Sequence, residues 1–310
     1  KRQQKREVEG IILPPGVSLD IAIAREKLEE IAGGKQGRLK PGKFGRDQQW
    51  MDSEFPLNNK SVGRCAATPL VKSWKEARAI NVDSVLFAGG TDPDDVHQGL
   101  LHDGWLLSAI QILSASGDEH YSDAEVDPLI ANIFVQSQSS AVGAYAVRLY
   151  KNGQWENVII DDYFPCLADN QSDGLSAGAA FAHSDHMEEI WIALLEKAFA
   201  KYHGSYASLE QGFTHLAMEE LTGGEADAIS IALASRGANK RVFWSKLKKY
   251  KRNRYLMGAG SVAADNADKE LQDTGIVFGA VYTLLRVVEI EGHQLIQLRN
   301  PPGNHGEWQG

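Results

Sequence analysis

Side chains that could act as nucleophiles or as metal ligands are few in this sequence. Its thiols are Cys65 and Cys166. A cysteine that follows a predicted strand, as Cys166 does, is more often a small packing residue than a nucleophile, and Cys65 has no stronger claim. The segment 183–186 (His-Ser-Asp-His) has metal-binding residue types, but its spacing is weak evidence for a metal site. We interpret His97 and His102 as surface or cleft-wall histidines.

A basic segment, KRVFWSKLKKYKRNR at positions 240–254, carries eight lysines and arginines with aromatic residues and leucine between them. The ordinary interpretation is an amphipathic helix with a solvated basic face. The alternative is a patch that docks on an acidic partner such as a microtubule or an anionic lipid surface. The candidate partner-binding residues are Lys246, Lys248, Lys249, Lys251 and Arg252.

The elements that would position these residues begin with a helix over 19–32, which Ser18 can cap and Gly33-Gly34 can end. The segment 34–46 is rich in Gly and Lys and is typical of a linker. The pattern further predicts helices over 103–116, 187–204 and 239–255, a β-hairpin with an Asn-Gly turn over 144–162, and strands over 276–290 and 293–299. Helices in the first part and strands in the last predict an α+β protein with two subdomains.

Composition excludes several classes of protein. The 310 residues are 43% hydrophobic, so wholesale disorder is excluded, and the net charge of −9 argues against broad nucleic-acid binding. Two cysteines exclude a disulfide framework and a four-thiolate zinc site. No apolar window approaches ~18 residues, and the charged N-terminus lacks an apolar signal core. We therefore expect a soluble intracellular protein without a membrane span.

From about Trp50 to Gly310 the chain resembles the calpain family of papain-like cysteine proteases. The segments that carry the resemblance, in family order, are MDSEFP at 51–56, LFAGGTDPDDVHQGLLHDGWLLSAI at 86–110, RLYKNGQWENVIIDDYFP at 148–165, the long segment 183–224 around IWIALLEKAFAKYHG, TGIVFGAVYTL at 274–284 and LIQLRNPPGNHGEW at 295–308. The resemblance implies a papain-like α+β fold with a cleft between two subdomains. We expect an extension or linker over 1–45, a helical subdomain over 46–210 and a β-rich one over 211–310.

The resemblance also assigns the positions that would carry the chemistry. Gly104 stands where the family has its nucleophilic cysteine, and Ala280 stands where it has the catalytic histidine. Asn300, which would orient that histidine, and the oxyanion-type Gln98 are present. Pro302 replaces a tryptophan that shields the asparagine. Since glycine cannot attack a carbonyl and alanine cannot transfer a proton, the resemblance implies a degenerate, inactive triad.

Calcium is a separate expectation. The resemblance implies a site with backbone oxygens of Ala88 and Gly90 and carboxylates of Asp95 and Glu189, which are the hard oxygen donors that Ca²⁺ prefers. Alternatively, Asp95 caps a turn and Glu189 pairs with a lysine on its own helix. Of the family's second calcium site, only Glu307 could belong. We therefore expect no required cofactor, with calcium as the candidate ligand.

The resemblance implies a pseudoprotease that acts as a binding or scaffold protein. Calpain-like proteins with degraded triads in protists are associated with the microtubule cytoskeleton or the flagellum, so we expect a cytoplasmic, cytoskeletal protein with partners such as tubulin. Two alternatives stay open: a calcium-dependent cysteine-type endopeptidase with residual activity, and a calcium-responsive switch without catalysis. We also expect further sequence after Gly310, because the family's second subdomain continues past this point.

Overall fold

The computed structural model describes residues 7–8, 11–12, 18–37, 39–43, 45–88, 90–115, 129–168, 178–231, 239–260 and 280–301. Within these ranges, none of the helices is both long enough and apolar enough to cross a bilayer. The short elements are β1 (Glu7–Val8), β2 (Ile11–Ile12), α2 (Asn59–Val62), β5 (Ser73–Glu76), α3 (Ala77–Ile80), η1 (Pro93–Asp95), η3 (Ala131–Ile133), β8 (Tyr163–Cys166) and η4 (Tyr206–Leu209). Strands β1 and β2 pair antiparallel, as do β5 and β8.

The segment predicted to be a linker is partly a small sheet. Strand β3 (Leu39–Pro41) pairs antiparallel with β4 (Gln48–Trp50). The prediction was wrong here because the composition of this segment is linker-like, whereas its pairing depends on distant residues. The backbone N–H of Trp50 donates to the Val142 carbonyl, 2.8 Å away, and so anchors β4 to the rest of the protein.

The predicted β-hairpin is confirmed, with strands β6 (Ala144–Lys151) and β7 (Gln154–Asp161). Its turn residues, Asn152 and Gly153, have φ angles of 52° and 83°, the left-handed values that a two-residue hairpin turn requires. Most of β6 is buried because the hairpin is covered on both sides, by α1 and by the helices of the core.

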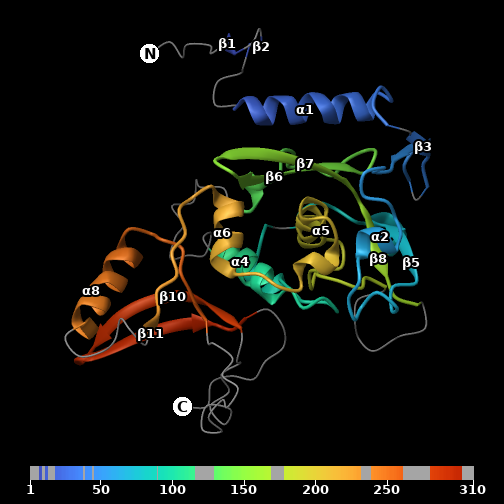
Figure 1. Cartoon of the computed structure of the whole chain (residues 1–310). Helices are drawn as coiled ribbons and strands as arrows, with labels where there is room; N and C mark the ends of the chain where they lie inside the picture. Colours follow the sequence, from blue (N-terminus) through green and yellow to red (C-terminus); the bar gives the residue numbers. More distant parts are fainter. Residues whose placement is uncertain are drawn as a thin grey trace.

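Helix α1 (Leu19–Ala32) coincides with the predicted helix and lies along the hairpin (Figure 1). Nε of Arg148 on β6 donates to Asp20 at 2.8 Å, and the fully buried Ala24 packs with Val135 and Ala146. The N-terminal extension is therefore part of the packed structure.

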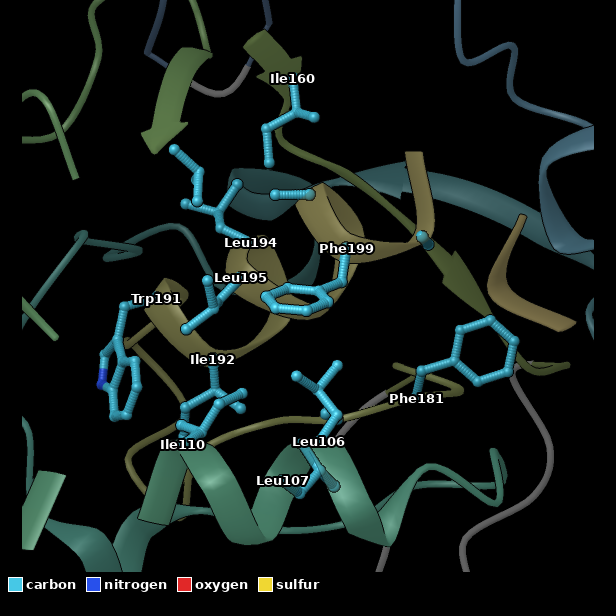
Figure 2. Close-up of a cluster of buried hydrophobic side chains, with 14 of the residues drawn as sticks. Leu106, Leu107, Ile110, Ile160, Phe181, Trp191, Ile192, Leu194, Leu195 and Phe199 are labelled. Carbon is cyan, nitrogen blue, oxygen red and sulfur yellow. The ribbon is translucent and has the colours of Figure 1, made fainter. Parts of the chain in front are cut away.

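Two helices form the centre of the main core. Helix α4 (Gly104–Ser114) is almost entirely buried, as its continuous apolar run predicted. Helix α5 (Trp191–His203) begins four residues later than predicted and ends at Gly204, which adopts the left-handed conformation of a C-cap. Figure 2 shows the leucine and isoleucine side chains of α4 facing Trp191, Leu195 and Phe199 of α5.

Buried ion pairs join α5 to the hairpin and the segment before it. The side chains of Lys197 and Asp161 are fully buried and form an ion pair, and Lys197 Nζ also donates to the Tyr163 carbonyl at 2.6 Å. Asp161 accepts a further hydrogen bond from the backbone N–H of Asp52 at 2.7 Å. A buried charge needs such complete pairing, because an unpaired one costs several kcal/mol.

The last part of the chain adds a helix and a three-stranded sheet. Helix α6 (Thr214–Thr222) packs on α4 and β6, and the sheet has the order β11-β10-β9. Its strands are β9 (Gly258–Gly260), β10 (Val281–Ile290) and β11 (His293–Arg299), and α8 (Asn239–Arg252) packs on β10. The helix predicted over 239–255 and the strand predicted over 276–290 are thereby confirmed with shorter bounds, and the strand predicted over 293–299 is confirmed with the same bounds.

Candidate functional site

The position expected to hold a nucleophile lies at the N-terminus of α4. Gly104 is the first residue of this 11-residue helix. A Cβ atom at Gly104 would lie 3.5 Å from Oε1 of Gln98, whose Nε2 donates a 2.6 Å hydrogen bond to the Leu101 carbonyl. The structure therefore places the oxyanion-type amide beside position 104. A helix N-terminus lowers the pKa of a thiol, but glycine has none.

Gly99 and Gly104, both near the N-terminus of α4, differ in whether the fold requires glycine. A Cβ atom at Gly99 would lie 2.4 Å from the Phe181 carbonyl oxygen, so the close approach of two backbone segments demands glycine there. A Cβ atom at Gly104 would meet Gln98 alone, at an ordinary contact distance, and Gly104 has no positive φ. The fold therefore does not require glycine at position 104.

A buried pair of carboxyl groups lies directly behind position 104. Asp103 and Glu196 are 0% and 1% exposed, and each carboxyl group shifts the pKa of the other. Burial raises the pKa of Asp103 to about 7, and burial together with the Asp103 charge raises the pKa of Glu196 well above its usual range. Both shifts oppose ionisation, so the two buried carboxyl groups compete for a proton instead of ionising together. Sequence reasoning missed this pair, although an acidic residue beside Leu195 in an apolar helix was a visible signal.

Ala280 and Asn300, the positions expected for the histidine and the asparagine, lie at one end of the three-stranded sheet. Ala280 directly precedes β10, and Asn300 directly follows β11. Because Thr283 pairs with Arg299, both residues lie at the same end of this ladder. Pro302 and Glu307 lie outside the described residues.

The two halves of the molecule touch close to these positions. Nε of Arg299, the residue before Asn300, lies 3.3 Å from Oδ1 of Asp94 in η1. In the sheet, a Cβ atom at Gly258 of β9 would lie 2.8 Å from the Ile112 side chain of α4. Strand β11 and the N-terminal half of the protein are thus joined by an ion pair next to the retained asparagine.

The candidate calcium residues Ala88 and Glu189 are in contact, but Ala88 contacts Glu189 through its backbone N–H and not through its carbonyl. Oε1 of Glu189 accepts the Ala88 backbone N–H at 2.7 Å, and its Oε2 accepts from Ser184 and Trp191 at 3.0 and 3.1 Å. The alternative that Glu189 pairs with a lysine of its own helix is therefore wrong. Burial and then the Glu189 charge raise the pKa of Asp95.

These residues fit a calcium ion. Gly90 has a φ of 134°, which only glycine adopts readily, and it holds the loop that carries the expected carbonyl donors. Asp95 and Glu189 supply two carboxylates to balance the ion's charge. His186 Nε2 lies 3.7 Å from Asp95 and opposes the rise in its pKa. Bound calcium would supply positive charge to offset the two carboxylates.

The remaining chemical candidates are not arranged for catalysis. Cys166 is fully buried, with its thiol donating to the Phe164 carbonyl at 3.4 Å, and Cys65 Sγ lies 3.3 Å from the Thr68 hydroxyl. His97 Nε2 forms an ion pair with Asp185 at 3.0 Å. No cluster of three or more His, Cys, Asp or Glu that could hold a metal occurs in the described ranges, the segment 183–186 included.

The basic segment forms helix α8, and most of its cations are exposed. Trp244 is 8% exposed and faces the protein, whereas Lys246, Lys249 and Arg252 are exposed. Lys248 forms a half-exposed ion pair with Glu289 at 3.3 Å, and Lys251 is half-buried. The structure therefore keeps the candidate partner-binding residues together on one helix, away from the triad positions.

Comparison with known proteins gives a consistent family. The sequence profile of calpain family cysteine proteases matches residues 50–310. The calpain-type cysteine protease DEK1 of Arabidopsis thaliana is 36% identical over 278 residues, which cover 85% of this chain and 12% of that protein. The calpain of Schistosoma mansoni is 33% identical over 265 residues, covering 84% of this chain and 33% of that protein. Calpain-9 of Rattus norvegicus is 30% identical over 267 residues, covering 84% of this chain and 35% of that protein.

This chain therefore spans well under two thirds of the length of these relatives. The profile match, together with the helices and strands described above, confirms the expected α+β fold of a papain-like protease core.

Proposed function

Because this chain belongs to the calpain family of cysteine proteases, we propose that it is a non-catalytic member, a pseudoprotease that binds other proteins. The observation that carries the proposal is Gly104 at the N-terminus of α4, beside Gln98. The scaffold around the reaction centre is retained, whereas the atoms that would react are missing. Ala280 at the histidine position supports the same conclusion.

Neither cysteine offers a replacement nucleophile. A thiolate must reach the substrate carbonyl, and Cys166 is fully buried in β8. Cys65 packs against the main core and contacts Thr68 rather than a histidine. Residual peptidase activity would therefore have to come from a group without the usual pairing of nucleophile and base.

Casein cleavage tests the proposal. We expect no calcium-dependent hydrolysis by the wild-type chain, and detectable hydrolysis by the double variant Gly104→Cys/Ala280→His, with Gly104→Cys alone serving as the matched control. The single variant should be alkylated by iodoacetamide at position 104 without cleaving casein. Cleavage by the wild type that survives Cys65→Ala and Cys166→Ala would reject the proposal.

A calcium-responsive switch is a second candidate, and the convergence of Asp95 and Glu189 favours it. Both carboxylates and the loop of Gly90 lie in the α4 half, while η1, which contains Asp95, also carries the Asp94 contact to Arg299. Calcium binding at Asp95 would thus act on the junction between the halves. Titration calorimetry should show heat of calcium binding that Asp95→Asn abolishes and that the exposed-site control Asp83→Asn retains. The absence of heat in the wild type would remove this candidate.

The expected cytoskeletal role implies that the partner is a microtubule. Sequence resemblance to cytoskeletal calpain-like proteins and the cationic helix α8 support association with microtubules in the cytoplasm or the flagellum. Co-sedimentation compares the wild type with Lys248→Ala/Lys249→Ala/Lys251→Ala. We expect the wild type to pellet with microtubules and the variant to remain largely in the supernatant. Equal pelleting would exclude α8 as the contact, and no pelleting would reject direct microtubule binding.

A further inference from the structure

Helix α8 is strongly positively charged, whereas the protein as a whole is acidic. Seven of its 14 residues are lysine or arginine, and none is aspartate or glutamate. The chain has a net charge of −9, so the residues outside this helix together carry −16. Figure 1 shows α8 on the outer side of the β10–β11 sheet, where a partner can reach it.

One side of the helix is left without compensating charge. Arg241, Ser245, Lys249 and Arg252 are all exposed, and their spacing of four, four and three residues places them along one side. The three cations have no acidic partner among the described residues, whereas Lys248 on the flank pairs with Glu289. At about 1.5 Å per residue, this stripe is roughly 16 Å long.

The surroundings increase the positive charge. Arg286 of β10 lies close to Lys251, and burial followed by this neighbouring cation lowers the pKa of Lys251. Like charges are thus crowded at the junction of α8 and β10, and an anionic ligand would relieve their repulsion.

The geometry favours a protein ligand over a membrane. The apolar side of α8 packs on β10 through Trp244, so it cannot enter a bilayer as the apolar face of an interfacial helix does. Val242 is the large apolar residue that α8 leaves exposed. One such residue does not make an inserting face.

Charge distribution also disfavours a long nucleic acid. A duplex that lay along α8 would extend past it and meet the strongly acidic remainder of the protein. A short extended peptide repeats every ~3.3 Å, so about five residues match the length of the stripe without reaching beyond it.

We propose that the stripe of Arg241, Ser245, Lys249 and Arg252 binds an extended segment rich in Asp and Glu on a partner protein. This inference rests on the proposed binding function and specifies the chemistry of the partner. The cations form ion pairs with successive carboxylates, and Ser245 hydrogen-bonds to the peptide between them.

Fluorescence anisotropy with a labelled hexaglutamate peptide tests the proposal on the full chain. We expect saturable binding that weakens as salt is raised, and binding roughly tenfold weaker for Arg241→Gln/Lys249→Gln/Arg252→Gln, because three exposed ion pairs of ~0.5 kcal/mol are lost. The matched control, Arg25→Gln/Lys27→Gln/Lys60→Gln, removes the same charge from exposed positions elsewhere and should bind like the wild type.

Three outcomes would overturn the proposal. The first is that hexaglutamate does not bind, and the second is that both triple variants lose the same affinity for it. The third is that the protein uses α8 to bind phosphatidylserine vesicles or a DNA duplex more tightly than hexaglutamate. Circular dichroism of each variant checks that α8 still forms. The casein assay is independent of this result, so failure here and failure of the pseudoprotease proposal are distinguishable.

Discussion

The half of the molecule built around α4 and α5 and the half built around β10 and β11 differ in how they hold charge. In the first, Lys197 and Asp161 are fully buried and completely paired. In the second, Lys248 and Glu289 pair with 47% of each side chain exposed. The pair in the first half therefore stabilises the fold from inside the core, whereas the pair in the second half is accessible to other molecules.

The same contrast holds for apolar side chains. The main core cluster draws its fully buried members from residues 55–221, and Figure 2 shows its centre. By contrast, β11 is exposed from His293 to Leu298. Gly104 thus lies in the well-packed half, at the start of the almost entirely buried helix α4.

The largest test of this contrast is removal of the buried lysine. Lys197→Met leaves Asp161 charged and buried, so we expect the free energy of unfolding to fall by about 3–5 kcal/mol. Lys248→Met removes an exposed pair and should cost less than about 1 kcal/mol. Urea denaturation followed by tryptophan fluorescence measures both. Similar costs for the two variants would contradict the contrast.

Alanine substitution at two glycines tests the packing around position 104. Gly99→Ala places a Cβ atom against the Phe181 backbone and should destabilise the protein by about 1–3 kcal/mol. Gly104→Ala finds space and replaces a poor helix former, so it should be neutral or stabilising by up to about 1 kcal/mol. Thermal unfolding of the two variants provides the measurement. A destabilising Gly104→Ala would mean that the fold does require glycine at this position.

The smallest expected effect is a change in pH dependence. Because the folded-state pKa of Asp103 is raised to about 7 and that of Glu196 is raised well above its usual range, their contribution to stability is complete below about pH 4 and is lost as pH rises through the folded values. The melting temperature of the wild type should therefore fall more steeply between pH 5 and pH 8 than that of Glu196→Gln, whose amide donates to Asp103 without a titrating proton. The exposed control Glu26→Gln should keep the wild-type slope. Parallel curves for all three proteins would show that the pair does not share a proton.

Local signals account for what the sequence predicted well. The Asn-Gly turn defines the hairpin, and Gly204 ends α5 where the periodicity stops. The β3–β4 sheet could not be predicted, because its anchor is a backbone hydrogen bond from Trp50 to Val142, far along the chain. Pairing of this kind has no local signature.

In the candidate site, too, some features have a local sequence signal and others depend on residues far apart in the chain. Motif spacing located Gln98 and position 104, and the structure places them side by side. The carboxyl pair was missed because Asp103 and Glu196 are brought together by the packing of α4 on α5, which no spacing reveals. The Asp94–Arg299 contact likewise depends on the arrangement of the two halves.

Helix α1 gives the protein a folding unit larger than the region that the family profile matches. The family profile begins at residue 50, whereas Ala24 on α1 closes a small cluster with Val135 and Ala146 on the far side of the hairpin. Proteolytic clipping between α1 and Trp50 would uncover that apolar surface on an extended strand pair, the kind of surface that drives aggregation. Preparations of this protein are therefore expected to stay monodisperse when they begin before Ser18 and to precipitate when they begin at residue 50.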